Sequence, residues 1–192
     1  MNKFLLVGLG NIGMEYKHTR HNIGFDVVEA FAMKHGAFFT NDRLADRAEV
    51  KWKGKIFICI KPTTYMNLSG RAFKYWQEKE KIALEQTLTI VDDLALPLSK
   101  LRLRPSGSDA GHNGLKDIQL AVGTDVYPKL RFGIGNQYPK GKQAEFVLGK
   151  WLPEEQSIVQ KKAEHCIEVI ENWASMGIQQ AMARVNNLTF TQ

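Results

Sequence analysis

The chain has 192 residues, of which 44% are hydrophobic and 24% charged, and its formal net charge is +6. This composition is typical of one globular domain that is large enough to bury a sizeable core. No apolar run approaches the length of a membrane span, and no small-residue cleavage site follows a long apolar core near the start, which argues against membrane and secreted proteins. We therefore expect a cytoplasmic protein, whose positive charge permits a nucleic-acid partner without proving one.

The first predicted element is a buried strand at residues 4–7, an uninterrupted apolar run that is closed by glycines. A polar loop follows, which contains Asn11, His21 and Asn22, and a helical pattern begins only after it. In open α/β sheets, ligands bind just beyond the carboxyl ends of strands. The position of this loop therefore makes it a candidate site.

The same stretch offers an alternative interpretation as a dinucleotide-binding site. Gly8, Gly10 and Gly13 match the glycine fingerprint of NAD-binding proteins. That fingerprint needs its third glycine to open a helix whose N–H groups hold the pyrophosphate, whereas a polar segment of mixed charge follows Gly13 here. The candidate acidic residue, Asp42, also lies further along the chain than the usual spacing of about 20 residues. The pattern therefore disfavours an NAD-binding enzyme but leaves it as an alternative.

Strands and helices are predicted to alternate along the rest of the chain. The predicted strands are 4–7, 47–52, 55–61, 88–91, 98–104 and 129–135, and the predicted helices begin near 23, 69, 115 and 153, with a short last helix that ends near 186. Ser69 is predicted to cap the second helix, and the segment before residue 153, rich in Gly, Lys and Gln, is predicted to be a loop. The order indicates one α/β domain over residues 1–192, with a twisted, mostly parallel mixed sheet and helices on both faces.

Residues 98–104 alternate between basic and apolar side chains. A period of two places Lys100, Arg102 and Arg104 on one face of the predicted strand. Such a row is either a solvated strand face or a phosphate-binding stripe. The glycine-rich loop 106–114, which follows directly, favours the second interpretation because glycines let backbone N–H groups approach a ligand closely.

Several common catalytic and metal-binding patterns are missing from the sequence. There is no HExxH, CxxC or clustered carboxylate motif, and Cys59 and Cys166 have no metal-ligand spacing, so we expect buried thiols and neither a metal nor a cofactor. Ser108 lacks the flanking glycines of a GxSxG nucleophile motif. The remaining possibility is a histidine base with a carboxylate partner, acting on water.

Three histidines, His18, His21 and His112, lie in loops at the ends of predicted strands or helices. Asp92, just past a buried strand, is the natural partner for a histidine in the loop after a neighbouring parallel strand. A carboxylate in that position holds the imidazole in one tautomer and stabilises the imidazolium as it forms.

Asparagines follow three different segments that we expect to converge at one end of the sheet. They are Asn11, Asn67 and Asn113. A single loop asparagine is usually a turn former. Three of them beside a histidine suit a peptide group or a developing oxyanion, because an amide both donates and accepts hydrogen bonds.

Four short motifs follow one another between residues 8 and 116. They are Gly8-Leu9-Gly10-Asn11-x-Gly13-x-x-Tyr16, Thr19-Arg20-His21-Asn22-x-Gly24, Lys61-Pro62-Thr63-Thr64-Tyr65-Met66-Asn67-x-Ser69-Gly70 and Gly111-His112-Asn113-Gly114-Leu115-Lys116. In this order and in a chain of comparable length, the motifs resemble those of bacterial peptidyl-tRNA hydrolase.

The resemblance implies a monomeric, metal-free and cytoplasmic esterase with a phosphorylase/hydrolase-like fold. Such an enzyme cleaves the ester between a peptide and its tRNA and so recycles tRNA after premature drop-off. By resemblance, His21 is the general base, Asp92 orients it, and Asn11 selects substrates with a blocked amino group. Residues implied to hold the substrate are Tyr16, Tyr65, Met66, Asn67, His112 and Asn113. Arg104 and Arg131 match basic positions that clamp the terminal phosphate, so that the expected contacts with tRNA involve its acceptor stem and 3′ end.

The sequence departs from the family pattern at three positions. Ile12 replaces a usual proline, Ala95 replaces a usual acidic residue, and Asp109 lies in a loop that usually carries more glycine. The main alternative is a noncatalytic RNA-binding relative that kept the fold and the basic face. The presence of both His21 and Asp92 argues against this alternative, because binding alone needs neither.

Overall fold

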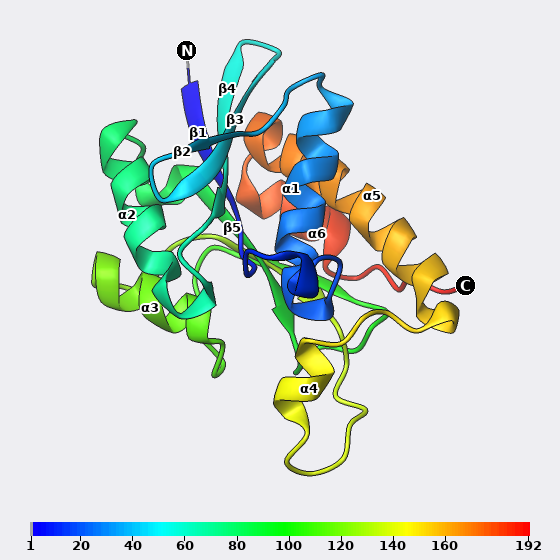
Figure 1. Cartoon of the computed structure of the whole chain (residues 1–192). Helices are drawn as coiled ribbons and strands as arrows, with labels where there is room; N and C mark the ends of the chain where they lie inside the picture. The colour runs from blue at the N-terminus through cyan, green and yellow to red at the C-terminus, as the bar shows by residue number, and fades with distance from the viewer. Residues whose placement is uncertain (1) are drawn as a thin grey trace.

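A central β-sheet separates two layers of helices in the computed structural model, which describes residues 2–192 (Figure 1). The strands are β1 (Asn2–Gly8), β2 (Thr40–Asp42), β3 (Ala45–Trp52), β4 (Lys55–Pro62), β5 (Thr87–Asp93), β6 (Leu101–Arg104) and β7 (Lys129–Gly133). The α-helices are α1 (Ile23–Lys34), α2 (Ser69–Lys79), α3 (Asn113–Val122), α4 (Gln143–Val147), α5 (Pro153–Met176) and α6 (Ile178–Val185).

The seven strands lie in the order β2-β3-β4-β1-β5-β7-β6. The four central strands, β4, β1, β5 and β7, run parallel, whereas β2 and β3 on one side and β6 on the other are antiparallel to their neighbours. This arrangement confirms the predicted α/β fold with a mixed sheet whose centre is parallel. Among residues 2–192, every helix is too short or too polar to cross a lipid bilayer.

Alternating side chains of the central strands build two separate cores. In β1, Phe4 and Leu6 pack on the side of α1, α5 and α6, while Leu5 and Val7 pack on the side of α2 and α3. A strand that is covered on both faces favours apolar residues on both, which explains the uninterrupted apolar run. Because β1 and β5 are parallel neighbours, their carboxyl ends lie at the same edge of the sheet.

The glycines of the fingerprint-like motif allow α1 to pack directly against β1. A Cβ atom on Gly8 would lie 2.2 Å from the carbonyl oxygen of Gly24, and one on Gly24 would lie 2.5 Å from that of Ile90. The helix begins only at Ile23, after the short 3-10 turns η1 (Met14–Tyr16) and η2 (Arg20–Asn22). Gly8 therefore serves close backbone packing, and none of the three glycines opens the helix that a pyrophosphate would need.

The basic row at 98–104 is shorter than predicted. Within β6, Leu101 and Leu103 are buried and Arg102 is exposed, as the alternation predicts. Lys100 precedes the strand, and its Nζ donates to the Leu188 carbonyl and to Thr189 in the C-terminal segment. Lys100 therefore fastens that segment and does not extend the row.

The outer edge of β6 is covered by one side chain. The amide of Asn186 accepts a hydrogen bond from the Leu103 N–H at 2.8 Å and donates one to the Leu103 carbonyl at 3.0 Å. These two bonds reproduce what a neighbouring strand would provide at that residue.

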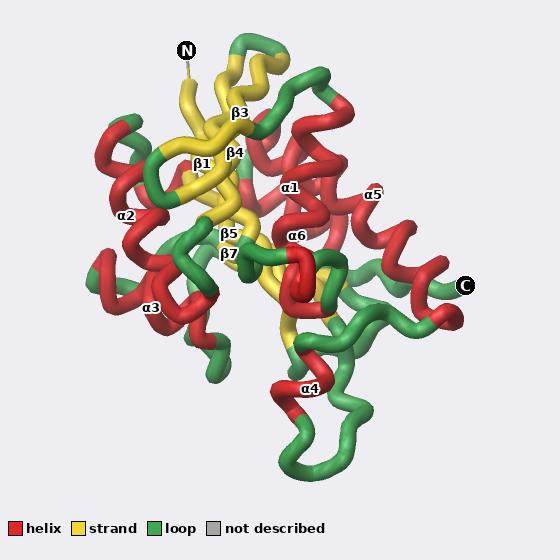
Figure 2. The backbone as a smooth tube through the Cα atoms, viewed as in Figure 1, coloured by secondary structure: helices red, strands yellow, loops and turns green. Residues whose placement is uncertain are grey.

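Two local predictions were wrong, one at a helix end and one in a loop. Ser69 does not cap α2, because it is the first helical residue and its hydroxyl donates to the Met66 carbonyl at 2.7 Å. Instead, Asp117 of α3 accepts the Gly70 N–H at 2.7 Å. The segment predicted as a loop before residue 153 contains α4, which extends with its flanking loops away from the sheet at the lower end of the view (Figure 2).

Candidate active site

A cavity of about 560 Å³ lies at the carboxyl end of the sheet, where loops after β1, β4 and β5 meet the start of α3. Its wall is formed by Asn11, His21, Met66, Asn67, Asp92, Asp93, Leu94, residues 109–113, Arg131, Gln143, Ala144, Val147 and Leu148. The parallel centre of the sheet thus brings together residues that are far apart in the sequence, as the general rule for ligand sites in such sheets predicts.

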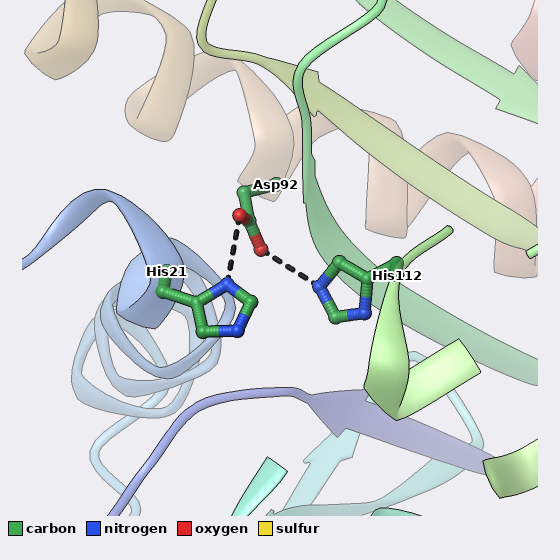
Figure 3. Close-up of side chains that lie close together, drawn as sticks. All are labelled: His21, Asp92 and His112. Carbon is green, nitrogen blue, oxygen red and sulfur yellow. Dashed lines mark hydrogen bonds and ion pairs between the residues drawn. The ribbon is translucent and has the colours of Figure 1, made fainter. Parts of the chain in front are cut away.

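The Asp92 carboxylate bridges two imidazoles in this cavity (Figure 3). Its Oδ2 lies 2.9 Å from Nδ1 of His21, and its Oδ1 lies 2.9 Å from Nε2 of His112. The carboxylate is buried because Asp92 belongs to β5, and the two rings reach it from η2 and from the residue that precedes α3. Both oxygens are therefore occupied, and the carboxylate cannot rotate without losing both bonds.

The hydrogen bonds assign different states to the two histidines. Nδ1 of His112 accepts from the backbone N–H of Gly114 at 3.1 Å and from that of Leu115 at 3.4 Å, so the ring caps α3. Its proton must then sit on Nε2 and point to Asp92. His112 was predicted to hold the substrate, but both of its nitrogens are already committed, so that the ring can meet a ligand only through carbon.

His21 keeps one nitrogen available. Because Nδ1 donates to Asp92, the neutral ring carries its lone pair on Nε2, which has no hydrogen-bond partner within residues 2–192. The side chain is 14% exposed and lines the cavity. An imidazole in this state can take a proton from a water molecule beside it.

Charge and burial shift the pKa values of His21 and Asp92 in opposite directions. Burial disfavours the imidazolium of His21, but the negative charge of Asp92 and the hydrogen bond to it prevail and raise the pKa of His21 above 6.5. Burial alone would raise the pKa of Asp92, yet the neighbouring His112 and His21 hold that pKa well below its usual range. The carboxylate is therefore ionised at neutral pH and able to stabilise a protonated His21.

Asn11 is held by three hydrogen bonds. Its backbone N–H donates to Asn22 Oδ1 at 2.9 Å, and its carbonyl accepts from Asn22 Nδ2 at 2.8 Å. Its own Oδ1 accepts the backbone N–H of Met66 at 2.7 Å. The amide orientation is thereby set, and Nδ2 remains a donor without a partner in the described part of the chain.

Most of the predicted site residues share the cavity, but three do not line it. Met66, Asn67 and Asn113 form part of the wall together with Asn11 and the two histidines. The residues outside the wall are Tyr16, Tyr65 and Arg104. Tyr65 is 52% exposed and has a positive φ of 65°, which is uncommon for a residue with a side chain.

Arg102, Arg104 and Arg131 of β6 and β7 form a basic face, on which Lys129 is buried and donates to backbone carbonyls. Arg102 lies opposite Arg131 in the sheet register, and Arg104 lies opposite Lys129, so all four side chains share one face. Arg131 is only 8% exposed, and its Nη2 donates to the Ser108 carbonyl at 2.6 Å. Nη1 of Arg131 also lies 3.6 Å from Asp93 Oδ2. Arg131 is therefore more buried and has more partners than the sequence suggested.

The wall contributed by α4 was missed in the sequence. Gln143, Ala144, Val147 and Leu148 line the cavity from a segment that was predicted to be a loop. The spacing of Ala144, Val147 and Leu148 is the i, i+3, i+4 pattern of one helix face, which was the available signal. Five residues are too few for this pattern to stand out.

The same cluster also has the donor set of a metal site. One ligand atom each from His21, Asp92 and His112 lies within 4.8 Å of the others. All three side chains are engaged in mutual hydrogen bonds, so an ion would have to displace the protons that join them. The observed bonds therefore favour an acid–base group over a metal centre.

Comparison with known proteins agrees with the geometry. The model of the family described as peptidyl-tRNA hydrolase matches residues 5–192. The chain belongs to the peptidyl-tRNA hydrolase family. It is 50% identical to the peptidyl-tRNA hydrolase of Porphyromonas gingivalis over 184 residues, which cover 96% of this chain and 100% of that protein. It is 48% identical to the peptidyl-tRNA hydrolase of Phocaeicola vulgatus, with coverage of 96% and 98%.

Solved structures of peptidyl-tRNA hydrolases have the same fold. The crystal structure of the enzyme from Acinetobacter baumannii matches with a TM-score of 0.92 and 35% identity, covering 98% of this chain and 96% of that one. Membership of the peptidyl-tRNA hydrolase family confirms the predicted function, hydrolysis of the ester bond between a peptide and tRNA. The alternative of an NAD-binding enzyme is wrong.

The Asp92 contact predicts how His21 titrates. In an NMR titration, the imidazole of His21 should change protonation above pH 6.5. Asp92→Asn should move this midpoint to lower pH, because burial remains while the negative charge is lost. Asp93→Asn is the matched control, since Asp93 is paired with Arg131 and has no contact with His21. An unchanged midpoint in Asp92→Asn, or an equal shift in both variants, would contradict the electrostatic account.

Proposed function

We propose that His21 is the general base of the hydrolysis and that Asp92 orients it. The supporting observation is the 2.9 Å contact between Nδ1 of His21 and Asp92, which leaves Nε2 available in the cavity wall. Nε2 takes a proton from water, and the oxygen of that water attacks the ester carbonyl carbon. When the tetrahedral intermediate collapses, the bond to the ribose oxygen of tRNA breaks and His21 returns the proton to that oxygen.

Asparagine side chains supply the hydrogen-bond donors that this reaction needs. Asn67 and Asn113 line the same cavity as His21, and their amides can donate to the carbonyl oxygen as negative charge develops on it. Neither side chain is committed to another hydrogen bond within residues 2–192. Met66 beside them is buried and offers an apolar contact to the peptide.

Asn11 is proposed to read the blocked amino group of the substrate. Because its Oδ1 accepts from the Met66 N–H, only Nδ2 can face a ligand. A donor in this position suits the carbonyl oxygen of a peptide bond. It repels a free ammonium group, which distinguishes peptidyl-tRNA from aminoacyl-tRNA.

The basic face is proposed to bind the phosphates of the tRNA acceptor end. Arg102 is exposed, Arg104 is half-exposed, and Arg131 reaches the cavity wall, so positive charge extends from the edge of the sheet to the site. Contacts with phosphate and shape are common to all tRNA substrates, whatever peptide they carry. Tyr16 and Tyr65, outside the cavity wall, are proposed to contact the substrate beyond the reacting ester.

Further properties follow from the family pattern as proposals. We propose one domain over residues 1–192, a monomer that needs no metal or cofactor, and a place in the cytoplasm. The departures at Ile12, Ala95 and Asp109 are proposed to tune the loops without changing the reaction. Asp109 accepts the Gly111 N–H at 2.8 Å, which shapes the loop that lines the cavity.

Removal of the base should abolish most of the activity. His21→Ala is expected to lower kcat for N-acetyl-aminoacyl-tRNA by about 10²- to 10⁴-fold while tRNA still binds. The matched control is His18→Ala, whose imidazole is exposed and paired with Asp26. Activity should persist in EDTA. Near-normal turnover by folded His21→Ala would exclude the mechanism, and lasting inactivation by EDTA would point to a metal at the same residues.

Substitution of Asn11 should alter substrate choice. Asn11→Asp keeps an oxygen for the Met66 N–H but replaces the free donor by negative charge, which attracts an ammonium group. We expect a smaller ratio of kcat/KM for blocked over free aminoacyl-tRNA. Asn113→Asp places the same charge in the same cavity and should leave that ratio unchanged. Equal ratios in Asn11→Asp and the wild type would refute the role.

Two arginines of the basic face, Arg104 and Arg131, should differ in their effects. Arg104→Ala is expected to raise KM for full tRNA. The salt dependence of this KM should become weaker, because tRNA binding releases fewer counterions when one phosphate contact is missing. A minimal substrate without the acceptor-stem phosphates should be indifferent to this change. Arg131→Ala should also lower kcat for the minimal substrate, because Arg131 holds the Ser108 loop. If Arg104→Ala impaired both substrates equally, the RNA would have to bind elsewhere.

A further inference from the structure

The helix α4 forms part of the catalytic cavity although the hydrophobic core holds it only weakly. None of its residues is buried, and only Phe146 and Val147 pack against the core. Gln143, Ala144 and Val147 line the catalytic cavity, while Phe146 lines a second cavity of about 570 Å³. Contacts with the hydrophobic core are therefore too few to fix the position of α4, and other contacts must determine it.

Arg20, which directly precedes His21, holds the end of α4. Its Nη1 donates to the Phe146 carbonyl at 3.1 Å, and its guanidinium carbon lies 4.2 Å from the centroid of the Phe146 ring. Its backbone N–H donates to the Gly149 carbonyl at 3.0 Å. Both the backbone and the side chain of Arg20 are thus attached to the segment that ends α4.

The same guanidinium reaches the start of α5. Its Nη2 lies 2.9 Å from Oε1 of Glu155, which also accepts the Leu152 N–H at 2.8 Å and so closes the first turn of α5. The Arg20 side chain is 6% exposed. A guanidinium this deeply buried is costly unless its partners are in place, so it favours the one arrangement in which all three segments meet.

We propose that Arg20 is a positioning residue for the hydrolysis, which fixes the α4 wall relative to the His21 imidazole. Arg20 lines the second cavity and does not line the catalytic one, so it acts through its neighbours and not on the ester. A substrate that packs against α4 is thereby aligned with the base. This inference rests on the proposed role of His21.

Loss of the Arg20 contacts should lower kcat strongly while it changes KM for tRNA little. A displacement of about 1 Å at a reacting centre can cost about 10²-fold in rate, so Arg20→Met is expected to lower kcat by about 10- to 100-fold. KM for tRNA should change little, because the basic face lies on β6 and β7. Arg20→Lys keeps the charge but can reach only one of the two acceptors, and its kcat should be intermediate.

Arg47 provides a matched control. It lies on β3 outside both cavities, pairs with Glu80 at 3.4 Å and stacks over Trp76 at 5.4 Å. Its Nε, like that of Arg20, is buried without a hydrogen-bond partner in the part of the chain that the structure describes. Arg47→Met therefore removes a similar set of contacts, and it should lower stability without lowering kcat.

The experiment measures kcat and KM for N-acetyl-aminoacyl-tRNA, the unfolding temperature, and hydrogen exchange of Gln143–Val147 in each variant. Lower kcat and faster exchange in the Arg20 variants alone would support the proposal. Wild-type kcat in folded Arg20→Met, or an equal loss in Arg47→Met, would overturn it.

Two milder variants decide the question if Arg20→Met does not fold. Arg20→Lys and Phe146→Leu should each lower kcat, and their combined loss should be smaller than the product of the single losses, because both weaken one contact. Independent, multiplicative losses would overturn the proposal. His21→Ala in the same assay separates the two hypotheses, since an active His21→Ala would exclude the base whatever the Arg20 variants show.

Discussion

The site depends on one buried carboxylate that two imidazoles share. Asp92 lies next to the end of β5, a strand that is covered on both faces, so its charge is stable there only because His21 and His112 each donate a hydrogen bond to it. This requirement ties together the loop after β1, the carboxyl end of β5 and the start of α3. Loss of either ring would leave one carboxylate oxygen without a partner.

The backbone at the start of α3 makes the two histidines unequal. Two imidazoles on one carboxylate could compete for the same role, but the backbone N–H groups at the start of α3 occupy Nδ1 of His112. The imidazole nitrogen that remains free to accept a proton is therefore Nε2 of His21.

A hydrogen bond between α3 and α2 helps to fix the loop that orients Asn11. Asp117 of α3 accepts the first free N–H of α2 at Gly70, and this bond joins the two helices next to the loop before α2. The Met66 N–H in that loop then orients the amide of Asn11. The Nδ2 donor of Asn11 is thus oriented by a backbone group of the loop before α2.

Sequence patterns predicted the parts of the molecule that obey a period or a dense motif. The strand at 4–7 was predictable because burial on both faces favours unbroken apolar residues. The rule for parallel sheets placed Asp92 near a loop histidine, and the family resemblance identified that histidine as His21. The state of His112 could not be predicted, because it depends on which nitrogen a helix end uses. The burial of Arg131 likewise depends on partners from other elements, Asp93 and the Ser108 carbonyl.

The Asn186 amide on the outer edge of β6 has a consequence for association. An unpaired edge strand offers its backbone to any other extended chain, and such pairing leads to dimers or aggregates. Here a side chain from the C-terminal segment already occupies the backbone of Leu103. The β6 edge is therefore blocked at Leu103 for the addition of another strand. The side chains of Arg102 and Arg104 remain accessible to solvent and to the phosphates of a nucleic acid.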